Sequence, residues 1–129
     1  MNKLGIVGSG ALARAVCWRL LECGYPVVVW GPDSNGVAEC VRSGAAAAAM
    51  PSELAATTNV IIVAAEEGAE SEQWQLGDHG VVTGLAERGV VVDMTTMSPT
   101  LSRRLARAYE EVGGRYLDAP VSGGAPAAR

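Results

Sequence analysis

The sequence lacks the features that mark membrane, secreted, metal-binding and nucleic-acid-binding proteins. No apolar run in the chain approaches the ~20 residues that a membrane span needs, and Gly8 and Gly10 interrupt the first apolar stretch, so we expect no secretory signal. The formal net charge of −4 argues against a nucleic acid or an acidic membrane as a partner. The three cysteines show no CxxC pairing. We therefore expect reduced thiols, no metal site and a soluble cytoplasmic protein.

Apolar runs rich in valine and isoleucine alternate with segments of helical periodicity. The runs are nearly continuous, which is typical of strands covered on both faces in a parallel sheet. They lie at 3–8, 25–30, 59–65, 89–94 and 115–121, and 44–50 is a weaker candidate for a short edge strand. Helices are expected at 10–23, 34–42, 52–57 and 68–76, and 81–87 is helical or loop. Repeated strand–helix units with right-handed crossovers predict an α/β fold, a Rossmann-type doubly wound parallel sheet of about six strands. We expect one domain, 1–129.

A last helix has the clearest boundaries. Ser98 is a favourable N-cap, Pro99 suits the first turn, and two glycines at 113–114 end the helix. Its expected apolar stripe consists of Leu101, Leu105, Ala108 and Val112. In the first helix, Gly24 is placed to cap the C-terminal end.

The strongest motif follows the first strand. Residues 8–13, which we call the phosphate loop, fit the pattern G-x-G-x-x-G/A, and they are Gly8, Ser9, Gly10, Ala11, Leu12 and Ala13. Gly8 allows a tight turn, Gly10 lets a diphosphate approach the backbone, and Ala13 lets helix and strand pack closely. The helix N-terminus then offers free N–H groups and a partial positive charge to the phosphates. A purely structural turn is the alternative, but this position between strand and helix favours dinucleotide binding.

The end of the second strand leaves the choice between NAD and NADP open. NAD sites place an acid there for the ribose hydroxyls, and NADP sites place an arginine for the 2′-phosphate. Asp33 is the one nearby acid, and between the end of this strand and Arg42 there is no arginine. Ser34 and Asn35 could bind a 2′-phosphate or cap the following helix.

Three stretches together resemble the N-terminal domain of the β-hydroxyacid dehydrogenases. They are GIVGSGALARAVCWRLLECGYPVVVW, GVVVDMTTMSP and YLDAPVSGG, and the resemblance runs from Lys3 to about Ala128. The family includes 3-hydroxyisobutyrate dehydrogenase and the tartronate, glyoxylate and succinic semialdehyde reductases. Imine reductases and 6-phosphogluconate dehydrogenase are its relatives. The DAP triplet favours the branch that acts on small hydroxyacids.

The resemblance implies a role for each matching position. The phosphate loop would hold the diphosphate, Ala64 and Ala65 would lie near the adenosine, and Thr96 near the nicotinamide ribose. A substrate carboxylate would be held by Ser122, Gly123 and Gly124, since consecutive glycines free backbone N–H groups to face an anion. Simpler alternatives exist: Asp93 and Asp118 could bind loop amides, Thr95 and Thr96 could be turn residues, and the two glycines could be a flexible terminus.

The sequence also departs from the family pattern in its cofactor region. Ala13 replaces the usual glycine, and AAEE at 64–67 stands where relatives carry a Leu-Pro pair. Gly31 and Pro32 replace the Asn-Arg pair of NADP-using members. These departures bear on the affinity for the cofactor and on the choice between NADP and NAD.

The general acid of the family has no counterpart in this chain. It is a lysine on a helix beyond this domain, whereas the single lysine here, Lys3, begins the first strand, far from the expected ligand edge. His79 lies in the stretch GDHG, where a lone histidine is more often solvated. We assign no catalytic residue. Nine arginines against one lysine are typical of a GC-rich bacterial genome.

The resemblance therefore implies a chain truncated before the family's C-terminal helical domain. We expect the cofactor half of a hydride-transferring oxidoreductase, inactive alone, with an exposed apolar face that forms a homo-oligomer or binds a partner chain. Three alternatives stay open: a non-catalytic nucleotide-binding or regulatory module, an imine-reductase-like half, and a degenerate scaffold that binds nothing well.

Overall fold

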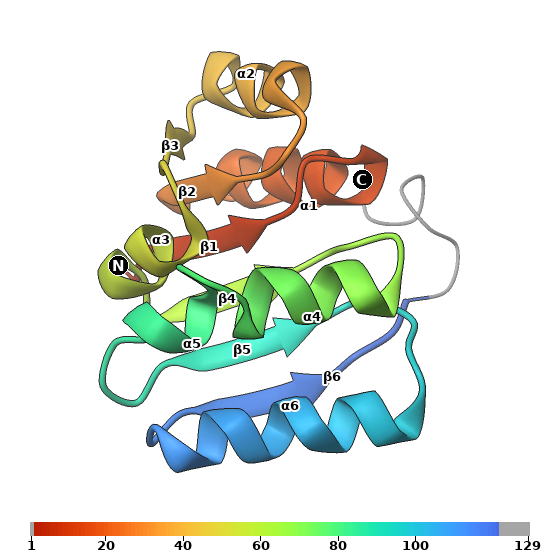
Figure 1. Cartoon of the computed structure of the whole chain (residues 1–129). Coiled ribbons are helices and arrows are strands. Elements are labelled where there is room, and N and C mark those ends of the chain that lie inside the picture. The colour runs from red at the N-terminus through yellow and green to blue at the C-terminus, as the bar shows by residue number, and fades with distance from the viewer. Residues whose placement is uncertain (1, 122–129) are drawn as a thin grey trace.

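The computed structural model describes residues 2–121 and has the predicted α/β architecture. Six strands form one sheet that is parallel throughout its described pairs, in the order β3-β2-β1-β4-β5-β6 (Figure 1). The strands are β1 Leu4–Val7, β2 Val27–Trp30, β3 Ala46–Ala47, β4 Val60–Val63, β5 Val90–Asp93 and β6 Arg115–Asp118. The helices are α1 Ala11–Glu22, α2 Ser34–Arg42, α3 Pro51–Thr57, α4 Gly68–Leu76, α5 Val81–Gly84 and α6 Pro99–Glu111. No helix within residues 2–121 is long and apolar enough to cross a bilayer.

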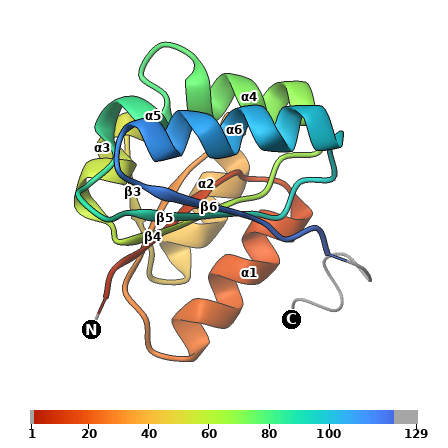
Figure 2. The ribbon, with the colours of Figure 1, turned by 90° about the horizontal axis from the view of Figure 1, so that it is seen from below.

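The sheet separates two cores, which explains why the strands are apolar at nearly every position. Neighbouring residues of a strand point to opposite faces, so Ile6 packs with α1 and α2 while Val7 packs with α3 and α6. Both side chains are fully buried. Figure 2 shows α4, α5 and α6 on one face of the sheet and α1 on the other. The predicted double winding is therefore confirmed.

Two helices differ from the sequence prediction in detail. The stretch 81–87 forms only the short helix α5, which ends at Gly84. In α6, Leu105 is buried as predicted, but Val112 is 48% exposed and Tyr109 is fully buried instead. The helix ends at Glu111, so Val112 lies beyond its last turn. Leu105 and Tyr109, an i, i+4 pair, are the residues of α6 that are buried in the core.

The strand order reverses at β1, which pairs with β2 on one side and with β4 on the other. In doubly wound sheets, ligands bind at the carboxyl edge of such a switch point. The loops that follow β1, β4 and β5 all leave the sheet at this edge. Lys3 lies at the opposite edge, where its carbonyl accepts a hydrogen bond of 3.2 Å from the Asn59 amide. The topology thus gathers the predicted cofactor segments and leaves the single lysine remote from them.

Candidate functional site

The phosphate loop turns sharply at Gly8, and only glycine fits there. Its φ of +145° is a conformation that side chains rarely adopt, and an added Cβ would lie 2.5 Å from the Ala64 carbonyl oxygen. The Gly8 amide donates a 2.7 Å hydrogen bond to the Trp30 carbonyl. The turn is therefore pressed between the ends of β2 and β4. This close packing supports the role that the sequence predicts for the first glycine.

The helix that follows presents its N-terminus to the carboxyl edge of the sheet. The N-cap is Gly10, which has no side chain to bond the first N–H groups, and the first turn carries no acid. Those N–H groups lack intrahelical partners and carry the positive end of the helix dipole. Ala13 is 1% exposed, and its Cβ would lie 3.2 Å from a Cβ on Gly8. A small residue at 13 thus allows the close packing that was predicted.

The side chain of Ser9 fastens the phosphate loop to the β2–α2 loop. Its side chain is buried, and its Oγ accepts a 3.0 Å hydrogen bond from the Asp33 amide. A Cβ at Gly31 would collide with the Ser9 side chain, and one at Gly36 would collide with the Ser9 carbonyl oxygen. Ser9 can therefore offer a ligand its backbone but not its hydroxyl. The role of these two glycines was not predicted from the sequence, although both lie shortly after the second strand.

Asp33 is the N-cap of α2, a role that the sequence analysis gave to Ser34 or Asn35 as an alternative. Its Oδ1 accepts a 3.1 Å hydrogen bond from the Asn35 amide. Ser34 is the first residue of the helix and is exposed. The capping prediction is wrong as to the residue, because the extended backbone of Asp33 places its carboxylate over the first turn. A carboxylate has further acceptor sites, so this cap is compatible with a bond to a ribose hydroxyl.

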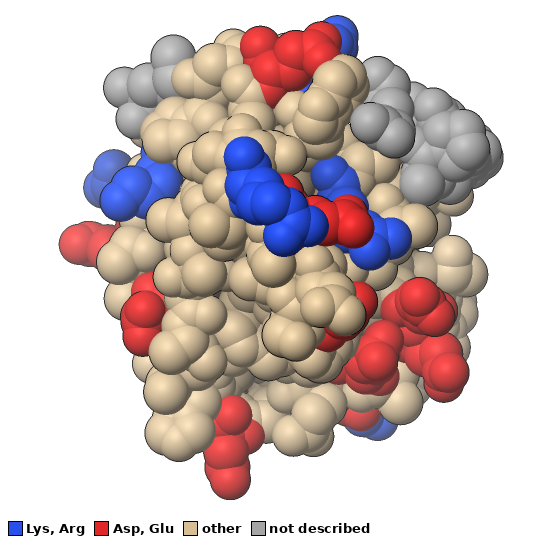
Figure 3. Space-filling view, turned by 90° about the horizontal axis from the view of Figure 1, so that it is seen from above, with Lys and Arg blue, Asp and Glu red and all other residues tan. Residues whose placement is uncertain are grey.

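Glu66, within the unusual AAEE stretch, has its carboxylate close to the phosphate loop. A Cβ at Gly10 would lie 3.3 Å from Glu66 Oε1. The Glu66 amide donates to Glu70 Oε1 at 3.3 Å, and Glu67 beside it is also exposed. Figure 3 shows acidic side chains gathered on the right of the view, the side toward which the strands of Figure 1 point. A carboxylate beside the N-terminus of α1 opposes the binding of a second anion there.

The segments after β4 and β5 are joined beneath the exposed Thr96. Asp93 is fully buried, and its Oδ1 accepts from the Thr95 amide at 3.0 Å. Thr95 Oγ1 in turn accepts from the Ala65 amide at 3.0 Å. The interpretation of Asp93 as a ligand of loop amides is thus confirmed, and Thr95 is a structural residue. Asp118 at the end of β6 is exposed.

The other oxygen of Asp93 holds three side chains that the sequence analysis did not single out. Oδ2 accepts from Ser71 Oγ at 2.9 Å, from Gln75 Nε2 at 2.8 Å and from Tyr116 Oη at 2.9 Å. Tyr109 extends the network by donating to Gln75 Oε1 at 2.6 Å. Burial, together with the Asp93 carboxylate, raises the pKa of both tyrosines, so they remain protonated donors. The sequence signal for this network was the pair of polar residues Ser71 and Gln75, which lie one helical turn apart on the same face of α4.

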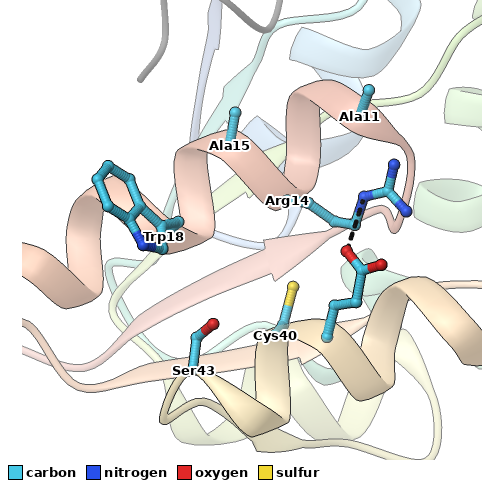
Figure 4. A pocket seen from close by; sticks show the side chains of 7 residues that line it. Ala11, Arg14, Ala15, Trp18, Cys40 and Ser43 are labelled. Atoms are coloured by element: carbon cyan, nitrogen blue, oxygen red, sulfur yellow. Dashed lines mark ion pairs between the residues drawn. The ribbon is translucent and has the colours of Figure 1, made fainter.

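A separate cavity of about 300 Å³ lies between α1 and α2. Arg14 Nε lies 3.6 Å from Glu39 Oε2, and both residues line this cavity. Figure 4 shows Arg14, Trp18 and Cys40 on its walls. The hydrogen bond between the thiols of Cys17 and Cys40, together with burial, raises the pKa of Cys17. Cys17, Cys23 and Cys40 are free thiols. Ala11 is the single predicted cofactor residue that lines this cavity.

The family model described as the NAD binding domain of 6-phosphogluconate dehydrogenase matches residues 3–129. The chain belongs to this family. It is an NAD(P)-binding domain of the oxidoreductase group that includes 3-hydroxyisobutyrate dehydrogenases. The substrate-binding residues predicted at 122–124 lie outside the described residues.

Three relatives show how far the similarity extends. The chain is 33% identical to the Arabidopsis thaliana 3-hydroxyisobutyrate dehydrogenase-like 3 over 99% of its own length and 40% of that protein. It is 30% identical to the cytokine-like nuclear factor N-PAC of Xenopus tropicalis over 95% of the chain and 23% of that protein. The structure of Psf3 in complex with NADP+ and 2-OPP superposes with a TM-score of 0.89 at 28% identity, covering 95% of this chain and 44% of that one. The chain thus spans less than half the length of these relatives.

Proposed function

We propose that the cofactor lies across the carboxyl edge of the sheet, with its diphosphate on the phosphate loop. The observation that carries this proposal is the fit at Gly8, where an added Cβ would meet the Ala64 carbonyl beside the open N-terminus of α1. Such a turn brings backbone N–H groups to an anion without a side chain in between. The adenosine side would contact Asp33, Ser34, Ala64 and Ala65, and the nicotinamide ribose would contact Thr96. This arrangement orients the nicotinamide toward the segment after β6.

The reaction that we propose is hydride transfer between this cofactor and a small 3-hydroxyacid or semialdehyde. Support comes from the name of the Arabidopsis relative and from the stretch YLDAPVSGG, which resembles that branch of the family. The nicotinamide supplies or accepts the hydride when bound. Ser122, Gly123 and Gly124 would hold the substrate carboxylate, which gives this chain the role of orienting both reactants.

Residues 1–129 are proposed to act as one cofactor-binding domain. This domain alone should not catalyse turnover. A carbonyl that receives hydride needs a proton donor within hydrogen-bond reach. Lys3 lies at the amino edge of the sheet. His79 follows the far end of α4, and its carbonyl accepts from the Ser52 amide at 2.9 Å. Neither side chain is placed to protonate a substrate at the carboxyl edge.

Calorimetric titration with NADH and NADPH tests the cofactor site. We expect the chain to bind at least one of them, and Gly10→Val to abolish binding because a branched side chain would stand where the diphosphate approaches. Ala56→Val, at an exposed position of α3, is the matched control and should bind like the wild type. No heat from either cofactor with the wild type would contradict the proposal. Oxidation of any hydroxyacid by the chain alone would contradict its inactivity.

A non-catalytic nucleotide-binding or regulatory module is the second candidate. The observation that favours it is the similarity to N-PAC, whose name is that of a nuclear factor. Both candidates require cofactor binding, so titration does not separate them. The two candidates are separated by supplying the general acid on a second chain. A fragment of a relative that carries the lysine-containing helical domain should restore turnover if this chain is a dehydrogenase half, and should not if it is a regulatory module.

An apolar surface that consists of Leu117 on β6 and Val121 beyond its end is the proposed surface for self-association or for a partner chain. Leu117 is 54% exposed and Val121 is 40% exposed. Figure 2 shows α6 covering one side of β6 while the other side carries no helix among the described residues. Exposed aliphatic side chains at a sheet edge favour association. We expect a concentration-dependent dimer in sedimentation velocity that Leu117→Asp abolishes, and a monomeric wild type at high concentration would contradict this surface.

A further inference from the structure

The Asp93 network reaches from the inner core to the carboxyl edge of the sheet. Asp93 closes β5, and a carboxylate buried this deeply is costly unless its oxygens accept hydrogen bonds. Its donors come from separate parts of the chain: Ser71 and Gln75 on α4, Tyr116 on β6 and the Thr95 amide. The carboxylate therefore fixes the position of a loop amide relative to two neighbouring elements.

Thr95 carries that constraint across to the next strand. It is 1% exposed, and its Oγ1 accepts from the Ala65 amide over a separation of 30 residues. Ala65 directly follows Ala64, whose amide donates to the Val7 carbonyl at 3.0 Å and whose carbonyl oxygen borders Gly8. A continuous series of contacts thus runs from Asp93 through Thr95 and the Ala64–Ala65 segment to the phosphate loop.

We propose that Asp93 and Thr95 are positioning residues for the dinucleotide. They hold the segment after β4 against the segment after β5, so that Ala65 and Thr96 present a preformed edge to the cofactor. Neither side chain touches the cofactor in this arrangement, since Asp93 and Thr95 are both buried while Thr96 is exposed. The proposal rests on the proposed function, because it requires the cofactor to lie at this edge.

The network has an inner arm that provides a control. Tyr109 donates to Gln75 Oε1 at 2.6 Å and stacks on Tyr116 with ring centroids 5.6 Å apart. Tyr109→Phe keeps the ring and removes the hydroxyl. It leaves in place the hydrogen bond that the Thr95 amide donates to Asp93 and the one that the Ala65 amide donates to Thr95. If the network served stability alone, the inner and outer arms would affect cofactor binding equally.

The test compares Thr95→Val, Thr95→Ser and Tyr109→Phe. Valine keeps the shape of threonine but removes the oxygen that accepts from Ala65, whereas serine retains that oxygen. We expect Thr95→Val to weaken the binding of NADH or NADPH by about three- to tenfold, the effect of one hydrogen bond. Thr95→Ser should restore most of the affinity. Tyr109→Phe should lower the melting temperature but bind like the wild type.

Amide hydrogen exchange in the cofactor-free protein gives a second readout that does not depend on binding. Exchange at Ala65 should accelerate by roughly tenfold in Thr95→Val and stay unchanged in Tyr109→Phe. Wild-type affinity in Thr95→Val, or an equal loss in Tyr109→Phe, would overturn the positioning role while the proposed function stood. A wild type that binds neither cofactor, with Ala65 still protected, would overturn both, and the exchange data would show that the proposed function had failed with the loop intact.

Discussion

The carboxyl edge of the sheet is built in two different ways on its two sides. Around the phosphate loop, the backbone segments pack closely because Gly8, Gly31 and Gly36 have no Cβ atoms that would collide with their neighbours. After β5, the backbone is held by hydrogen bonds, since the buried Asp93 carboxylate accepts from four donors. The first side needs small residues at fixed places along the chain. The second needs polar residues that only the fold brings together.

The largest effect is expected at Gly8. Gly8→Ala should cost on the order of 3 kcal/mol of unfolding free energy, since it combines backbone strain with overpacking against the Ala64 carbonyl. Gly24→Ala is the matched control, because Gly24 also has a positive φ, +91°, but no described heavy atom lies within 4 Å of its added Cβ. Urea denaturation measures both. An equal loss in the two variants would show that space at Gly8 contributes nothing.

A loss of similar size is expected when the charge of Asp93 is removed. Asp93→Asn should cost about 3 kcal/mol, because the amide nitrogen that replaces one carboxylate oxygen cannot accept from the donors which that oxygen satisfies. Asp118→Asn, at the exposed end of the neighbouring strand, should leave stability unchanged. Thermal denaturation of the two variants decides the point. An Asp93→Asn protein as stable as Asp118→Asn would mean that the segment after β5 does not depend on the negative charge of Asp93.

A smaller effect of opposite sign is expected at Glu66. Glu66→Gln should tighten binding of the dinucleotide about two- to fivefold, the usual effect of one charge at a helix N-terminus. Salt at high concentration should reduce the difference. Glu67→Gln removes the same formal charge one residue further along and serves as the control. If both variants bound equally tightly in calorimetry, only the net charge would matter and the position of Glu66 would not.

The smallest effect concerns Asp33. Asp33→Ala should cost about 1 kcal/mol through loss of the cap of α2. Asp33→Asn should keep the cap, because asparagine is an equally good N-cap, yet remove the carboxylate that suits the ribose of NAD. We expect the ratio of NADPH to NADH affinity to rise in Asp33→Asn at unchanged stability. An unchanged ratio would show that Asp33 acts only as a cap.

The parts of the molecule that follow from local pattern were predictable from the sequence. Ser98 accepts from the Leu101 amide at 3.2 Å and caps α6 as expected, and Pro51 opens α3. The glycine spacing of the phosphate loop placed the turn correctly. These features depend on residues within a few positions of one another, where backbone preference and side-chain reach decide the outcome.

The parts that depend on distant partners were not predictable. Ser71 and Tyr116 meet at Asp93 because β5 lies beside β6 and beneath α4, which no local pattern reveals. The burial of Tyr109 in place of Val112 has the same origin, since the depth of α6 against the sheet is set by tertiary packing. The residues at 122–124 stay a prediction.

The contact of Ser9 with Gly31 and Gly36 restricts how cofactor preference can be altered by engineering. Importing the Asn-Arg pair of NADP-using relatives at positions 31 and 32 would drive the new asparagine into Ser9. Exchanging Ser9 for glycine would remove the side-chain clash but give up the bond from the Asp33 amide. The backbone nitrogen of residue 9 would still lie 2.8 Å from the new Cβ, so the loop itself would have to shift. Residues that are separate in the sequence must therefore be replaced as one unit.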